Sequence, residues 1–170
     1  MPPKEIAQGN LLFHAVHGVC RVDEVGREGP PNRKVSSYSL VPKHANRMKV
    51  RFVIPAAEME LSGFHAPVSP KEAREILAYL ETGDLSAECE EDRAWELAKA
   101  LLASSRDDLG MKDARKRQMI ERSARGLVGE LAFVLKMTLK EAAGGVRKCL
   151  GDPSQVSPTV LTALLHAGEG

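Results

Sequence analysis

Residues 69–80 read SPKEAREILAYL, and here the hydrophobic pattern of the chain becomes helical. Ser69 suits an N-cap, Pro70 fits the first turn, and Glu72 completes a capping box. Apolar residues then recur three or four positions apart, as on one face of a helix; they are Ala73, Ile76, Leu77 and Leu80. Gly83 is well placed to end the helix. The sequence therefore predicts a helix that begins at Ser69 and stops at Gly83.

The same period continues to the end of the chain. Trp95 falls at a position where a buried helix residue is expected, and Met119 opens the long apolar stripe of the third helix. Thr138 and Glu141 form a second capping box. We expect residues 168–170 to be frayed. The predicted further helices cover residues 88–103, 113–136, 139–150 and 157–165.

Upstream of residue 68 the pattern is that of short strands. Strands are predicted near residues 11–13, 19–25, 38–41 and 49–54, with a loop over the Gly- and Pro-containing residues 26–32. Alternation in the last strand puts Lys49, Arg51 and Val53 on one face and Val50, Phe52 and Ile54 on the other. Short, closely spaced strands suit a small, bent barrel of the SH3 or Tudor type. The predicted fold is α+β: a barrel over residues 1–67 and a domain of four to five helices over residues 68–170.

Composition suits a folded protein in a reducing compartment. Of the 170 residues, 43% are hydrophobic and 28% charged, which argues against disorder. The three cysteines are far apart and form no CxxC, so neither a disulfide framework nor a zinc site is expected. No apolar run has the length of a membrane span, and the first residues do not resemble a signal peptide. We expect a cytoplasmic protein without a membrane partner.

Five segments resemble the CarD/CdnL family of bacterial transcription regulators. They are residues 8–22 (QGNLLFHAVHGVCRV), 38–41 (YSLV), 48–55 (MKVRFVIP), 62–69 (SGFHAPVS) and 124–132 (ARGLVGELA). In that family a Gly-Asp pair leads into an apolar strand and a turn, and a later strand ends in an apolar-Pro pair. Each motif alone is loose, but their order and spacing together are fairly specific. The resemblance covers most of residues 8–150.

The resemblance implies a Tudor-like N-terminal domain that binds a lobe of the RNA polymerase β subunit. It also implies a helical domain that contacts promoter DNA near the melted region. By that comparison Arg51, with Lys49 and Val53, lies on the polymerase-contacting strand, where we expect Arg51 to meet an acidic residue. Arg21 and Arg27 would extend this patch.

Two features depart from the family pattern. Family members carry a Trp followed by Arg-Arg-Tyr between the first two helices. The corresponding segment here, residues 84–92, is short and acidic and has no such run. That departure weakens the expectation of minor-groove contact, because an acidic stretch repels phosphate. The family's Gly-Leu-Arg triplet is Gly63-Phe64-His65 in this chain.

A basic cluster opens the predicted third helix and has two interpretations. Its members are Lys112, Arg115, Lys116, Arg117, Arg122 and Arg125. They could contact DNA phosphates, with Arg115, Lys116, Arg122 and Arg125 as the candidate residues, or pair with the acidic stretch 88–96. Cations near a helix N-terminus oppose the helix dipole, so a compensating partner is expected.

No catalytic constellation, nucleotide loop or metal motif is present, so no enzyme activity and no cofactor are expected. His14 and His17 form an HxxH pair without nearby further ligands, which disfavours a metal site. The sequence predicts a regulator that binds RNA polymerase and modulates initiation at promoters, associated with the nucleoid through polymerase. The alternative is a protein–protein adaptor whose helical domain binds another regulatory protein and not DNA.

Overall fold

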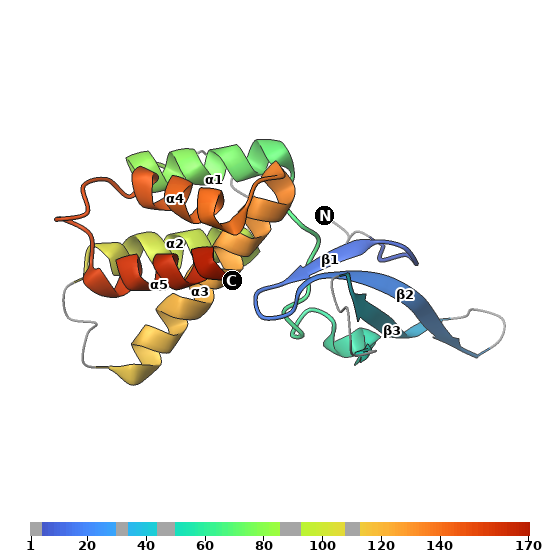
Figure 1. The fold of residues 1–170 in the computed structure, drawn as a ribbon. Coiled ribbons are helices and arrows are strands. Elements are labelled where there is room, and N and C mark those ends of the chain that lie inside the picture. The colour runs from blue at the N-terminus through green and yellow to red at the C-terminus, as the bar shows by residue number, and fades with distance from the viewer. Residues whose placement is uncertain (1–4, 30–33, 44–49, 86–92, 108–112) are drawn as a thin grey trace. The chain divides into compact units, whose positions relative to one another are not determined.

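The computed structural model describes residues 5–29, 34–43, 50–85, 93–107 and 113–170. The chain divides into two compact units, Met1–Pro67 and Val68–Gly170, which we call the sheet unit and the helical unit. Figure 1 shows strands in the first and helices in the second, so the fold is α+β as predicted.

The sheet unit is an antiparallel meander in which each strand pairs with its neighbour in sequence. The strands are β1 (Leu11–His14), β2 (Gly18–Glu28), β3 (Lys34–Pro42) and β4 (Phe52–Pro55), and a short 3-10 helix, η1 (Ala56–Glu58), follows. Within the described residues β1 and β4 do not pair, so the sheet is open and the expected closed barrel is not confirmed.

Three details of the strands differ from the predictions. β2 continues to Glu28, through the first part of the predicted loop, because Gly26, Arg27 and Glu28 pair with β3. β4 begins at Phe52 and includes Pro55, which is tolerated at the end of an edge strand. Phe52 and Ile54 pack against the core as predicted, but Val50 is 37% exposed. Lys49 lies outside the described residues.

The core of the sheet unit is small and mostly aliphatic. Its buried members are Leu12, Cys20, Val22, Leu40, Met59 and Phe64. Met59 comes from the turn after η1, and Phe64 comes from the segment that follows. Burial of these side chains supplies the main driving force for folding of this unit.

The helical unit has five helices: α1 (Pro70–Thr82), α2 (Arg93–Ser105), α3 (Ala114–Leu135), α4 (Leu139–Cys149) and α5 (Pro158–Glu169). Both predicted capping boxes form, at Ser69 for α1 and at Thr138 for α4, and Gly83 ends α1 with a φ of 77°. α5 is longer than predicted and includes Gly168 and Glu169, so the expected fraying from residue 168 is wrong. The predicted start of α2 at residue 88 lies outside the described residues.

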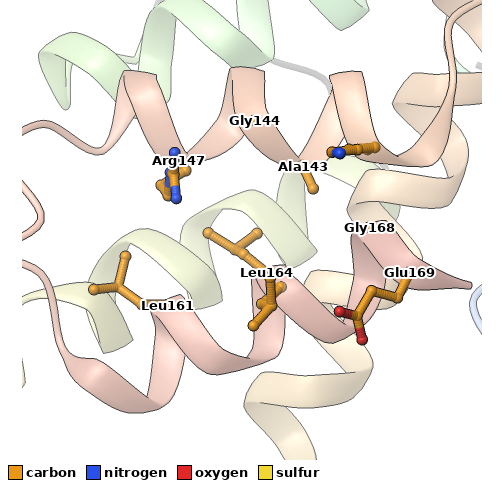
Figure 2. Close-up of a pocket in the computed structure, with 9 residues that line it drawn as sticks. Ala143, Gly144, Arg147, Leu161, Leu164, Gly168 and Glu169 are labelled. Atoms are coloured by element: carbon orange, nitrogen blue, oxygen red, sulfur yellow. The ribbon is translucent and has the colours of Figure 1, made fainter.

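α3 is the central helix of this unit, since it packs against each of the other four. Its buried stripe includes Ile120, Leu127 and Leu131, but Met119 is 47% exposed, contrary to the prediction. Trp95 is 2% exposed and packs edge-on against Tyr79, which confirms it as a core residue. α4 and α5 leave an open groove between them, shown in Figure 2.

Candidate functional site

The two edges of the sheet differ in how far they are covered. On the β1 side, Phe13 and His65 exchange two backbone hydrogen bonds: Phe13 N–H donates to His65 O at 2.7 Å and His65 N–H donates to Phe13 O at 3.0 Å. On the other side, β4 has β3 as its only strand partner within the described residues. An open strand edge is a template for pairing with another chain.

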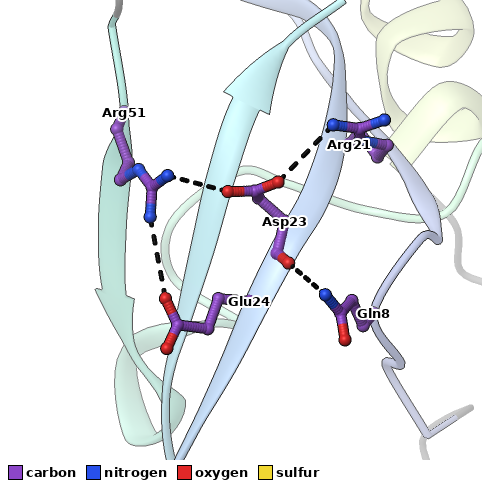
Figure 3. A network of polar contacts seen from close by, with 5 residues as sticks. All are labelled: Gln8, Arg21, Asp23, Glu24 and Arg51. Atoms are coloured by element: carbon purple, nitrogen blue, oxygen red, sulfur yellow. Dashed lines mark hydrogen bonds and ion pairs between the residues drawn. The ribbon is translucent and has the colours of Figure 1, made fainter.

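A polar network centred on Asp23 lies beside this open edge. Arg51 donates to Asp23 Oδ2 at 2.8 Å and lies 3.7 Å from Glu24 Oε2, while Arg21 lies 3.5 Å from Asp23 Oδ1. Gln8 Nε2 donates to the Asp23 carbonyl at 2.7 Å. Figure 3 shows the side chains of Arg21 and Arg51 approaching Asp23 from opposite sides. The two arginines are therefore held by a single carboxylate.

A bulge in β2 explains why Asp23 and Glu24 can both serve Arg51. Val22 pairs with Leu40 and Glu24 pairs with Ser39, so Asp23 is an extra residue opposite this step of β3. A bulge interrupts the alternation of side chains and lets two successive residues serve one face. The sequence pattern alone did not reveal this bulge, because it depends on pairing with a strand fifteen or more residues away.

The structure brings some of the predicted docking residues together and separates others. Val53 is 65% exposed on β4, and the Arg51 side chain is 49% exposed just before it. Arg21 joins them through Asp23. Arg27 lies six residues further along β2, about 20 Å away at the usual strand rise, and beyond a second register shift. It is exposed but lies outside the network.

Sequence reasoning missed an aromatic cluster on the same unit. His14 stacks on His17 with ring centroids 4.6 Å apart, His17 lies 4.5 Å from Phe52, and His14 lies 4.7 Å from Phe64. His14 Nδ1 accepts hydrogen bonds from the backbone N–H groups of Val16 and His17. The Nδ1 atom of His14 is therefore occupied by hydrogen bonds to its own backbone turn. Within the described residues no group of three or more His, Cys, Asp or Glu side chains could hold a metal ion.

The basic residues of α3 fall into two groups. Arg115, Arg122 and Arg125 are exposed, and their spacing puts them on one face of the helix with the exposed Met119. Lys116 points elsewhere and pairs with Asp107, not with the acidic stretch. Residues 86–92 lie outside the described residues, so Glu96 is the one described acid of that stretch, and it lies 3.9 Å from Arg93 within α2. Asp113 caps α3 by accepting from the N–H groups of Arg115 and Lys116, which offsets the unfavourable cations.

Of the two described cysteines, Cys20 is buried and Cys149 is partly buried. Burial raises the pKa of Cys20 to about 11, so this thiol stays protonated at neutral pH. Burial, and then the charge of Glu81, raise the pKa of Cys149. Neither group has the lowered pKa that a thiolate nucleophile needs.

Comparison with known proteins adds nothing to the resemblance to the CarD/CdnL family. The chain matches no protein-family model and no curated protein. None of the described helices combines the length and the apolar character that a membrane span requires.

Proposed function

We propose that this chain is a bacterial transcription regulator of the CarD/CdnL type, which binds the RNA polymerase β subunit through its sheet unit and modulates initiation. The observation that carries the proposal is the open β4 edge, where exposed Val53 adjoins the Arg51–Asp23–Arg21 network. Arg51 and Val53 lie on the strand that the family resemblance assigns to polymerase contact, and Arg21 was expected to extend that patch. No enzyme activity is part of the proposal.

The Tudor-like character of the sheet unit belongs to the same proposal. Four antiparallel strands in sequence order and two register shifts in β2 support it, because bulges bend strands in the way small barrels require. η1 follows β4 directly and contacts β3, which adds a further covering element.

Docking would combine backbone pairing with a charged anchor. A strand of the β subunit adds to β4, and Val53 contacts an apolar side chain on its surface. Arg51 has five N–H donors and uses one on Asp23 in a clear hydrogen bond, so donors remain for an acidic residue of the polymerase. Asp23 and Glu24 hold the guanidinium in place, which reduces the entropy lost on binding.

The test is binding of the full chain to a purified β-lobe fragment, measured by calorimetry. We expect a complex at micromolar concentration and a loss of about tenfold or more for Arg51→Glu, because the reversal repels the partner's acid and Asp23 alike. Arg74→Glu, the reversal of another exposed arginine, on α1, should leave the affinity unchanged. Absence of a complex, or equal effects of the two reversals, would contradict the proposal.

The adaptor alternative differs only in what the helical unit binds. The exposed arginine face of α3 favours promoter DNA, whereas the groove between α4 and α5 favours a protein. Under either reading the protein acts in the cytoplasm and reaches the nucleoid through polymerase.

A further inference from the structure

The groove between α4 and α5 is an apolar surface with charged rims. Its volume is about 520 Å³, and Leu161, Leu164 and Leu165 of α5 line it together with Ala143 and Gly144 of α4. Figure 2 shows Leu161 and Leu164 pointing from α5 toward α4. Leu165 is 61% exposed at its border. Leu161 is partly exposed and Leu164 is buried at the floor. An exposed leucine beside a concave apolar surface is typical of a binding groove.

Two adjacent glycines in the middle of α4 have no internal packing role. A Cβ at Gly144 or at Gly145 would meet no heavy atom within 4 Å, so neither glycine is needed for close packing within the described residues. Gly168 of α5 is different, since its Cβ would lie 3.1 Å from Ala143 Cβ, where the two helices approach each other. Glycine in a helix interior costs roughly 1 kcal/mol relative to alanine. Gly144 lines the groove and keeps its floor open to close approach by another backbone.

Two cations mark the α4 side of the groove. Lys140 and Arg147 both line it, and neither has an ion-pair partner in the part of the chain that the structure describes. They are seven residues apart on α4, which corresponds to about 10 Å along the helix axis. Glu169 lies at the α5 side, so the positive charge is confined to one rim.

We propose that this groove binds an acidic amphipathic helix of a partner protein. The apolar face of that helix covers Leu165 and the partly exposed Leu161, above the buried Leu164, and two of its carboxylates, seven residues apart, pair with Lys140 and Arg147. A fatty acid would also suit an apolar floor, but it has one carboxylate and cannot satisfy both cations. The proposal concerns the helical unit alone and does not depend on docking by the sheet unit.

The probe is a fluorescent synthetic helix with leucines on one face and two glutamates seven residues apart, mixed with the full chain and followed by anisotropy. We expect a micromolar Kd, about tenfold weaker binding to Gly144→Gln, and a similar loss for the double variant Lys140→Glu/Arg147→Glu. Gly145→Gln is the matched control: it makes the same change one residue away, outside the groove lining, and should bind as well as the wild type. Both glutamines favour the helix, so loss of folding does not complicate the comparison.

Several results would overturn the proposal. They are no binding by the peptide, equal binding by a peptide with lysines in place of the two glutamates, and equal losses for Gly144→Gln and Gly145→Gln. Displacement of the peptide by laurate or by duplex DNA, or a dimer that Gly144→Gln dissociates, would assign the groove to another occupant. Arg51→Glu should bind the peptide normally, so failure here and failure of polymerase docking remain distinguishable.

Discussion

Asp23 in the sheet unit and Glu130 in the helical unit are both carboxyl groups that organise their surroundings, but in opposite ways. The Asp23 side chain is 32% exposed and holds two arginines at the surface. Glu130 is 0% exposed, and its Oε1 accepts a hydrogen bond from the Val68 N–H at 3.0 Å, where the helical unit begins. One unit therefore uses a carboxyl group to hold two arginines at its surface, and the other uses one to fix the backbone in its interior.

The same contrast holds for arginines. Arg21 and Arg51 are paired with carboxylates of their own unit. Arg115, Arg122 and Arg125 of α3 have no ion-pair partner within the described ranges. Paired arginines favour specific short-range contact, because their side chains are already oriented. Unpaired arginines on one helix face instead favour long-range attraction of phosphates.

The largest expected effect is on Glu130. Glu130→Ala should lower the free energy of unfolding by about 3 kcal/mol, because it leaves the buried Val68 N–H without its acceptor and opens a cavity. Glu130→Gln keeps an acceptor oxygen and should cost clearly less. Trp95, the single tryptophan, lies in the helical core, so its fluorescence during urea unfolding reports this unit. Equal losses for both variants would show that the hydrogen bond is not what Glu130 supplies.

The next effect concerns the arginines of α3. Charge reversal of Arg115 and Arg122 together should weaken binding to duplex DNA about tenfold at low salt and reduce the slope of log affinity against log salt by about 2. Reversal of Arg21 and Arg51 should leave that slope unchanged, because those side chains are already paired. The measurement is a fluorescence titration at several salt concentrations, and an unchanged slope for the α3 variant would favour the adaptor alternative.

A smaller effect is expected at Asp23. Asp23→Ala should change stability by less than about 1 kcal/mol, because ion pairs this exposed contribute little. It should nevertheless weaken polymerase docking several-fold, since Arg51 loses its orientation. Thermal unfolding by circular dichroism and calorimetric titration with the β lobe separate the two effects. A large loss of stability with normal docking would reverse the contrast between Asp23 and Glu130.

The smallest effect is the pH dependence of the α4 cap. The Thr138 N–H and hydroxyl donate to Glu141 and lower its pKa from 4.5. A carboxyl group whose pKa is lower in the folded chain stabilises the fold above the unfolded pKa, and this contribution is lost as pH falls through the folded pKa. Glu141→Gln should therefore show a slightly smaller drop in Tm than the wild type between neutral pH and about pH 3. An equal drop in the two proteins would mean that the cap does not contribute through its charge.

The parts of the fold that could be predicted are those with local causes. Ser69 with Glu72, and Thr138 with Glu141, lie within one turn of each other, so the sequence itself carries both caps. Trp95 was predictable as core from its place in a helical pattern.

What could not be predicted depends on contacts distant in sequence. The bulge at Asp23 exists only in pairing with β3, and burial of Glu130 depends on the chain returning past Val68. Met119 fits the apolar period of α3 but is 47% exposed, whereas Ile120 beside it is buried, so the buried face of the helix is set by packing and not by the period alone. Whether the sheet closes into a barrel likewise depends on the geometry of all four strands together, so the sequence of one strand does not predict it.

The form of β4 has a consequence for solubility. An open sheet edge invites indefinite addition of strands and hence aggregation. β4, however, has only four residues, is preceded by the charged Arg51 and ends in Pro55, which has no N–H to donate. A short edge with an adjacent charge and a terminal proline is a poorer template for repeated strand addition than a long, flat, apolar edge. We therefore expect the β4 edge, which has no second strand partner within the described residues, to resist repeated self-addition of strands.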